Sequence, residues 1–426
     1  MTETDFLKNL SSSSLDNLIK IVQEAVRRPT LSGQEKPLVE YLSRTARQLG
    51  YDNVYSDRMG NLIARVVVGN GQGPKVVLSG HLDTVSATEK DWDSATGPFS
   101  GAIKDGKIYG RGVADMKGAV GAMLLAAASL KKLPKNFSGE VYLVGTVIEE
   151  LFEGVAFLEA LKEIRPDYII IGEASDGKIN LGQRGRAEIL ITVYGEPQHA
   201  STGRKVVNAI EQVAYVIDSF HRWYRSPADP ILGKRNIVPT DIKIPVGGGG
   251  GLDGRGGNST VPNRVEITYD VRTLVGDTAD SILKLIKDNL EPTIALGRQK
   301  YPQLKDPTVV LAQDSATTYT GVVIQQPKFA PAWRTDKKSV ISQKAVAGLQ
   351  KVGESEPKFG AYSFCTDGSA IVKYRELFPD DNVEIIGYGP GSERVAHTVN
   401  EFLDIQELQR IYSGYLGIVS ELLRHE

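Results

Sequence analysis

The sequence has a single cysteine, Cys365, among its 426 residues. One cysteine excludes an internal disulfide framework and a cysteine-rich metal site. No apolar run approaches the ~20 residues that a membrane-spanning helix needs, so we expect no membrane span. The N-terminal segment Met1–Asp5 also lacks the basic and apolar regions of a secretory signal. Together these absences predict a cytoplasmic protein.

An excess of charge of either sign is also missing. The formal net charge is −2, from 50 basic and 52 acidic residues, which gives no reason to expect nucleic acid or a membrane as a partner. Hydrophobic residues make up 41% and charged residues 24%, which is typical of a globular protein. Histidine is scarce, with five residues at positions 81, 199, 221, 397 and 425, so the place of each is informative.

Predicted strands and helices alternate in the first part of the chain and again after about residue 326. Strands are expected at Leu62–Val68, Lys75–Ser79, Glu140–Ile148, Tyr168–Ile171 and Val383–Gly387, and helices at 14–27, 33–49, 116–132, 337–352 and 404–424. This alternation predicts an α/β fold, with a mainly parallel sheet and helices on both of its faces.

Between residues 186 and 325 the order of elements changes. Strands are expected at Glu188–Tyr194, 238–246, Arg264–Thr273 and Thr308–Ala312, with helices at 206–220 and 279–290. The order β-α-β-β-α-β is that of a ferredoxin-like α+β domain. We therefore expect a discontinuous domain formed by residues 1–185 and 326–426, interrupted by a smaller domain at 186–325.

A glycine-rich stretch lies inside the smaller domain, at Gly247–Gly257. It lacks the Gly-Lys-Ser/Thr that opens the helix after a phosphate-binding loop, which argues against a phosphotransfer enzyme. Two interpretations stay open. The stretch is either a flexible hairpin connection or a mobile loop that brings Arg255 to a substrate.

Histidine and acidic residues follow several of the predicted strands. The segments are Ser79–Val85 with His81 and Asp83, Thr146–Glu150 with Glu149 and Glu150, Ile170–Ser175 with Glu173, and Ala396–Glu401 with His397. Asp115 directly precedes an alanine-rich helix, at a position where a dinucleotide-binding fingerprint would need glycine. Ligand sites in open α/β sheets form at the carboxyl ends of the strands.

Each of these segments also has an ordinary explanation. His81 could lie in a surface turn, Asp115 could cap a helix, and Glu149-Glu150 could begin a solvated loop. The whole set, however, is what a shared site at one sheet edge requires. Imidazole and carboxylate ligands suit a divalent ion, and the imidazoles favour zinc over magnesium or calcium.

The ordered set of motifs resembles the M20 family of co-catalytic zinc peptidases and deacylases. That family includes acetylornithine deacetylase, succinyl-diaminopimelate desuccinylase, glutamate carboxypeptidases and aminoacylases. The residues that carry the resemblance are His81-x-Asp83, Asp115, Glu149-Glu150, Glu173, His199 and His397. The stretches Gln183–Arg186, Thr320-Gly321 and Phe364–Gly368 look closest to a subgroup often labelled selenium-metabolism-linked hydrolases.

The resemblance implies a role for each residue of the catalytic domain. Asp115 would bridge two divalent ions, zinc first with cobalt or manganese as alternatives. His81 and Glu173 would complete one site, and Glu150 and His397 the other. Asp83 would orient His81. Glu149 would take a proton from a metal-bridging water and pass it to the leaving amine. The family also has a cis peptide after the bridging aspartate, here Asp115–Met116.

The smaller domain would act as a lid and a dimerisation domain. The resemblance implies that His199 donates a hydrogen bond to the oxyanion, often from the partner subunit, which predicts a homodimer. Arg272 would bind a substrate carboxylate. An asparagine common in the family is Ser259 here, with Asn258 one step earlier as the substitute.

The function that follows is metal-dependent hydrolysis of an amide bond in an N-acyl amino acid or a short peptide. A hydrolase of carbamoyl or ureido amides is an alternative. A catalytically inactive, metal-binding regulatory protein is another, although retention of Glu149 argues against it.

Overall fold

The chain forms two compact units. The computed structural model describes residues 3–202, 206–221, 228–245 and 259–424. The first unit consists of Met1–Gln183, Ser315–Ile324 and Trp333–Glu426, and the second of Arg184–Asp314 and Gln325–Ala332.

The boundaries differ from the expected 186–325 because Ser315–Ile324 belongs to the first unit. Tyr319 explains this difference, since its hydroxyl donates to the carbonyl oxygen of Gly60 at 2.8 Å. The Thr320 hydroxyl likewise donates to the carbonyl oxygen of Arg58 at 3.0 Å. The catalytic and lid roles expected for the two domains stay predictions.

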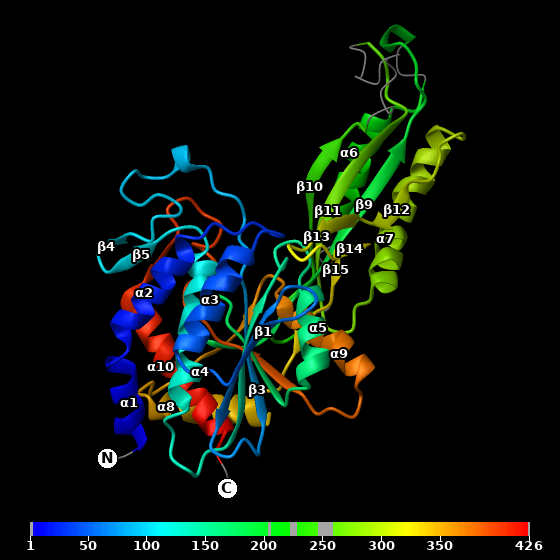
Figure 1. The fold of residues 1–426 in the computed structure, drawn as a ribbon. Helices are drawn as coiled ribbons and strands as arrows, with labels where there is room; N and C mark the ends of the chain where they lie inside the picture. The colour runs from blue at the N-terminus through cyan, green and yellow to red at the C-terminus, as the bar shows by residue number, and fades with distance from the viewer. Residues whose placement is uncertain (1–2, 203–205, 222–227, 246–258, 425–426) are drawn as a thin grey trace. The chain divides into compact units, whose positions relative to one another are not determined.

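A mixed sheet forms the middle layer of the first unit (Figure 1). In spatial order its strands are β1 (Asn53–Ser56), β2 (Leu62–Val68), β6 (Gly139–Thr146), β3 (Lys75–His81), β7 (Tyr168–Ile171), β18 (Glu384–Gly387), β8 (Ile179–Gln183) and β16 (Trp333–Arg334), and β17 (Phe359–Tyr362) pairs with β8. The four central strands β6, β3, β7 and β18 are parallel. The expected parallel sheet is thus confirmed at its centre, while β1, β2 and β16 pair antiparallel.

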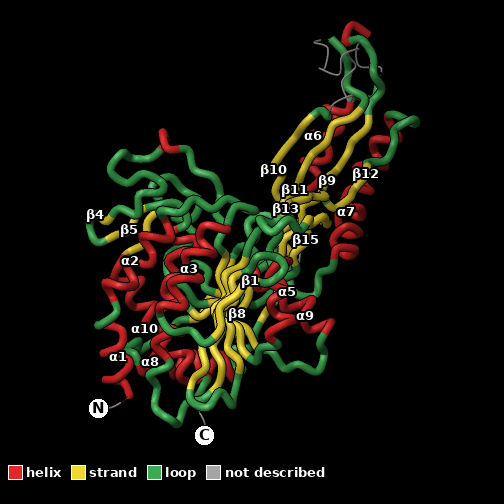
Figure 2. The backbone as a smooth tube through the Cα atoms, viewed as in Figure 1, coloured by secondary structure: helices red, strands yellow, loops and turns green. Residues whose placement is uncertain are grey.

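Helices cover both faces of this sheet, as predicted. One face carries α1 (Glu3–Ser12), α2 (Leu15–Val26), α3 (Lys36–Gln48), α4 (Gly118–Leu130), α8 (Val340–Lys351) and α10 (Ile405–Leu422), and the other α5 (Val155–Ile164) and α9 (Ala370–Leu377) (Figure 2). Alternate residues of β3 serve the two faces. Val76 and Leu78 join the core under α4 and α10, and Val77 joins the core under α5 and α9. Burial on both sides explains the unbroken apolar runs of these strands.

The apolar segment Val113–Leu130 is long enough to cross a membrane, but 94% of it is buried inside the protein. It contains α4 and the tight turn that leads into it, and α4 packs against α2 and α10. Within the described residues, this segment is a core helix of the first unit.

The second unit has the predicted ferredoxin-like arrangement. Its elements are β9 (Gly185–Tyr194), α6 (Ala209–Phe220), β10 (Asn236–Lys243), β11 (Arg264–Thr273), α7 (Ala279–Lys300) and β12 (Thr308–Leu311), with β15 (Phe329–Ala330) also paired to β9. The strand order is β10-β11-β9-β12, and each of these pairs is antiparallel. Every second residue of β9 is buried in the core shared with α6 and α7.

Short strands complete the fold. They are β4 (Ile103–Lys104), β5 (Lys107–Tyr109) and β19 (Phe402–Asp404) in one sheet, and β13 (Gln313–Thr317) and β14 (Val323–Pro327) in another.

Two elements differ from expectation in an informative way. The helix expected at 279–290 continues to Lys300 through Pro292, because its apolar face repeats every four residues at Ile282, Ile286, Leu290 and Ile294. The strand expected to reach Ile148 ends at Thr146 instead, because Ile148 has a φ of 58°. A positive φ takes the backbone out of the extended conformation.

Candidate metal centre

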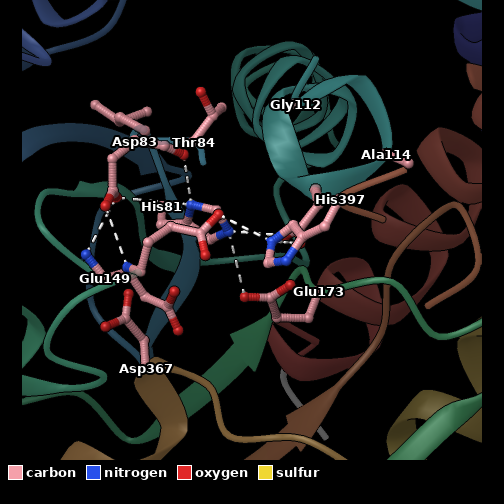
Figure 3. Close-up of polar contacts among 12 residues, drawn as sticks. His81, Asp83, Thr84, Gly112, Ala114, Glu149, Glu173, Asp367 and His397 are labelled. Atoms are coloured by element: carbon pink, nitrogen blue, oxygen red, sulfur yellow. Dashed lines mark hydrogen bonds and ion pairs between the residues drawn. The ribbon is translucent and has the colours of Figure 1, made fainter. Parts of the chain in front are cut away.

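The carboxyl ends of the four parallel strands bring the predicted metal ligands together. His81 ends β3, and in register it lies opposite Thr146, the last residue of β6. Glu149 and Glu150 follow β6, Glu173 follows β7, and His397 lies in the loop after β18. Figure 3 shows His81, Glu173 and His397 pointing toward one another, with Glu149 close to His81.

Asp115 lies between the two histidines. Its Oδ1 is 2.9 Å from Nε2 of His81, and its Oδ2 is 3.1 Å from Nε2 of His397. It belongs to a tight turn, Val113–Lys117, that precedes α4, and the Asp115–Met116 peptide bond is cis. Each carboxylate oxygen therefore faces a different imidazole, which is the placement expected of a bridging ligand.

A further carboxylate accompanies each histidine. Oε1 of Glu173 is 3.6 Å from Nε2 of His81, and Oε1 of Glu150 is 3.2 Å from Nε2 of His397. In the described part of the chain, ligand atoms of His81, Asp115 and Glu150 lie within 4.8 Å of one another, as do those of His81, Glu149 and Glu173. Glu149, expected to be the base, is thus also close enough to be a ligand.

The charges of this cluster call for a cation. Burial, reinforced by Glu173, Asp367 and Glu150, raises the pKa of Glu149 well above its usual range, although His81 opposes the shift. Burial and Asp115 likewise raise the pKa of Glu173. Hydrogen bonds to Asp115 and Glu150 raise the pKa of His397 to about 10. Buried carboxylates that repel one another while they attract imidazolium protons form a donor set that fits divalent cations.

His81 is oriented by the backbone of Asp83. Nδ1 of His81 is 2.8 Å from the Asp83 carbonyl oxygen, so it donates there and Nε2 faces the cluster. The Asp83 carboxylate, expected to accept this proton, is 3.7 Å away. It accepts instead from the backbone N–H groups of Glu149 and Glu150, each at 3.1 Å. Asp83 thereby touches both the histidine ligand and the segment that carries the proposed base.

Glu401 holds the turn around Asp115. Its side chain is fully buried, and Oε1 accepts from the backbone N–H groups of Ala114 at 2.9 Å and Asp115 at 3.2 Å. Oε2 accepts from the Gly112 N–H at 3.1 Å and from the Arg111 guanidinium at 2.7 Å. The sequence segment Ala396–Glu401 therefore supplies a candidate ligand, His397, and also a support for the turn that carries Asp115.

Comparison with known proteins identifies the family of this chain. Residues 77–421 match the model of a family described as Peptidase family M20/M25/M40. The chain belongs to this M20 family. It is accordingly a hydrolase that acts on amide or peptide bonds. The family is metal-dependent, and the cluster around Asp115 is a possible metal-binding site of this chain.

Relatives of this M20 chain match it over nearly its whole length. The uncharacterized protein YgeY of Escherichia coli (strain K12) is 26% identical over 390 residues, which cover 90% of this chain and 89% of YgeY. Succinyl-diaminopimelate desuccinylase of Sulfurovum sp. (strain NBC37-1) is 25% identical and covers 94% of this chain and 96% of its own length.

A solved structure shows the same fold. The YXEP protein of Bacillus subtilis, described as a dinuclear metal binding peptidase from the M20 family, superposes with a TM-score of 0.63 at 14% identity. The match covers 96% of this chain and 98% of YXEP.

The remaining predicted site residues of this M20 hydrolase lie in the second unit. Nδ1 of His199 lies 2.8 Å from the Ser201 hydroxyl and accepts from the Ser201 backbone N–H at 3.2 Å. Arg272 pairs with Asp270, with Nε 2.8 Å from Oδ1. Asn258, like Arg255 and the rest of the glycine-rich stretch, lies outside the described residues.

Sequence reasoning missed three buried carboxyl groups near the centre, those of Glu35, Asp367 and Glu401. Asp367 accepts from the Gly154 N–H at 2.9 Å and from the Thr146 hydroxyl, and burial raises its pKa to about 6. In Figure 3 it points toward Glu149. Asp367 and Glu401 both lie in segments that the sequence analysis had singled out. The presence of an acidic residue in such a segment could therefore have identified them as candidates.

Proposed function

We propose that this protein hydrolyses an amide bond in an N-acyl amino acid or a short peptide, with two divalent ions and with Glu149 as general base. The observation that carries the proposal is the placement of Asp115, whose two oxygens face two different histidines. The cluster then divides into two ligand sets. His81, Asp115 and Glu173 would hold one ion, and Asp115, Glu150 and His397 the other.

Zinc suits these ligands best, and cobalt and manganese are the alternatives. Ions bound at this centre would supply Lewis-acid activation of water and of the amide carbonyl. Two ions per chain would be consistent with the description of the Bacillus subtilis relative as dinuclear metal binding.

Glu149 would move the proton. As the attacking water bonds to the amide carbon, its proton passes to the Glu149 carboxylate. The same proton then goes to the amide nitrogen as the C–N bond breaks. This leaves an amine and a carboxylic acid, which loses its remaining proton to the solvent. Glu149 is buried, at 5% exposure, and its carboxylate lies within 4.8 Å of the ligand atoms of His81 and Glu173, beside the proposed metal sites.

The second unit would contribute to substrate recognition. His199 is proposed as the donor to the oxyanion, through Nε2, because Nδ1 is engaged by Ser201. Arg272 and Asn258 are proposed to bind a substrate carboxylate, and at Arg272 the substrate would compete with Asp270 for the guanidinium. The desuccinylase relative supports an acyl amino acid as the substrate class.

The experiment that tests this function is hydrolysis of a mixed panel by metal-free protein. The panel contains N-acetyl and N-succinyl amino acids, dipeptides and ureido acids, each assayed before and after addition of Zn²⁺, Co²⁺ or Mn²⁺. We expect free amine only when metal is present, from N-acyl amino acids or dipeptides. Release from the ureido acids alone would favour the carbamoyl alternative. No release from any compound, despite bound metal, would favour a binding role.

We further propose a homodimer that forms through the second unit, and a cytoplasmic location stays a prediction. Strand β10 ends its sheet, and no described strand pairs with its outer edge. Val238, Ile242 and Ile244, on and just after this strand, are 44%, 52% and 47% exposed. A row of exposed apolar side chains on an open edge suits pairing with a second copy. Pro239 and Lys243, in contrast, are residue types that blunt the edges of monomers.

Replacing Ile242 by lysine should convert the dimer to a monomer, because like charges would face each other across a two-fold edge. The molar mass from light scattering after gel filtration would fall from twice the chain mass to once. Leu296→Lys is the matched control, because Leu296 is 67% exposed on α7 and should leave the mass unchanged. A wild-type protein that is monomeric at micromolar concentration would contradict the proposal.

A further inference from the structure

In the segment that carries Glu149, each backbone N–H from Val147 to Glu150 donates a hydrogen bond to a side chain from elsewhere in the first unit. The Val147 N–H donates to Oδ1 of Asn61 at 3.1 Å, and the Ile148 N–H to Oε1 of Glu35 at 3.0 Å. The next two N–H groups donate to the Asp83 carboxylate, as described above. Four consecutive backbone donors after β6 therefore bond to buried side chains instead of to a neighbouring strand.

Ile148, two residues after the end of β6, is the point where this segment turns. Its φ of 58° is in the left-handed region, where a β-branched residue is strained. Its side chain is buried, at 1% exposure. This strained conformation turns the chain so that Glu149 and Glu150 lie among the candidate metal ligands. A strained backbone persists only where its surroundings fix it, and Glu35 bonds the N–H of the strained residue itself.

Burial of the Glu35 carboxyl group at this place costs free energy of folding. It is fully buried just before α3, and Oε2 has no hydrogen-bond partner in the described part of the chain. Burial, with the Asp83 carboxylate in addition, raises the pKa of Glu35 to about 7. A buried polar oxygen without a partner destabilises a fold, so its presence calls for an explanation beyond packing.

The loop before α3 is built to hold Glu35 in place. The Gly33 N–H donates to the same Oε1 at 2.8 Å, and the Ser32 hydroxyl donates to Oδ2 of Asp83 at 2.7 Å. Gly33 has a φ of 83°, and a Cβ there would lie 2.6 Å from the carbonyl oxygen of Thr317. Glycine is therefore required at this position, and the loop contacts two of the acceptors behind Glu149 at once.

We propose that Glu35 is a positioning residue for catalysis, which acts through the Ile148 peptide to aim Glu149 at the substrate. The inference rests on the proposed role of Glu149 as base. Glu35 lies outside residues 77–421, where the family match lies. Its side chain reaches the site through the backbone N–H of Ile148, in the segment after β6.

Three substitutions separate positioning from stability. Glu35→Gln keeps an oxygen that can accept from Ile148, and its kcat should stay within about threefold of wild type. Glu35→Met fills a similar volume without an acceptor, and its kcat should fall about 10- to 100-fold with KM changed by less than about threefold. Glu35→Asp withdraws the carboxylate by one methylene, and its kcat should fall in the same direction. It provides the test if the methionine variant does not fold.

All variants are assayed as folded, zinc-loaded protein on the panel compound that the wild type hydrolyses fastest. Glu421→Gln is the control, because Glu421 is also a buried carboxylate, at 7% exposure, bonded to Lys351 on α8. It should lower the melting temperature without changing kcat. Bound zinc should equal the wild-type amount throughout.

The outcomes distinguish a failure of the positioning role of Glu35 from a failure of the proposed function. Wild-type kcat in both Glu35→Met and Glu35→Asp would overturn the positioning role while leaving the proposed function intact. An equal loss of kcat in Glu35→Gln would also overturn it, because the acceptor would then not be the cause. A wild-type protein without metal-dependent hydrolysis would overturn the proposed function, and this inference with it.

Discussion

Replacing Glu149 by glutamine should leave the bound zinc unchanged and lower kcat about 10²- to 10⁴-fold, the usual contribution of a general base. Glutamine has nearly the shape of glutamate, and its backbone N–H would still donate to Asp83. It cannot accept the proton of the attacking water, and so it cannot deliver one to the leaving nitrogen. The measurement pairs metal analysis by mass spectrometry with steady-state kinetics.

The control for this substitution is Glu153→Gln, because Glu153 lies four residues further along the same loop and is not among the candidate metal ligands. It should have full activity. A loss of zinc from Glu149→Gln would show that Glu149 is a ligand, which its place beside His81 and Glu173 allows. Wild-type turnover with zinc retained would assign the proton transfer to another group.

Replacing Asp115 by alanine should weaken the binding of both ions and lower hydrolysis below detection. One carboxylate faces both histidines, so its loss removes a ligand from each set. Loss of a group that merely supports a ligand lowers metal affinity by about 10- to 100-fold, and loss of a bridging ligand should exceed that. Zinc affinity is measured by competition with a chromophoric chelator.

Two further variants make the Asp115 result specific. Glu173→Ala should weaken the binding of one ion, and Glu150→Ala should weaken the binding of the other. Each variant should therefore retain one tightly bound zinc per chain. If Asp115→Ala also retains one tight zinc, Asp115 serves a single ion and the bridging assignment is wrong.

The sequence was most informative where a buried strand ends in a polar residue. Burial on both faces makes the middle of β3, β6 and β7 mainly apolar. His81 at the end of β3, and Glu149 and Glu173 just after β6 and β7, therefore stand out. The two-domain order was visible for the same reason, because β9 and β11 alternate buried and half-buried residues while the central strands do not.

The residues that position the site through hydrogen bonds to distant backbone groups could not be predicted from the sequence in this way. Glu35 looked like part of a helix that starts at 33, and its partner Ile148 is 113 residues away. Glu401 bonds to backbone groups more than 280 residues earlier. Side chains that accept from distant peptides carry no local pattern. The positive φ of Ile148 also has no signal in an apolar run, which is why the strand was expected to continue.

The most direct test of the two-ion account is a zinc titration of metal-free protein. Bound zinc and hydrolysis of the fastest panel compound are measured on the same samples. The account predicts that hydrolysis is absent without zinc and reaches its plateau only as the second equivalent per chain binds. A plateau at one equivalent, or hydrolysis by protein shown to be metal-free, would contradict it.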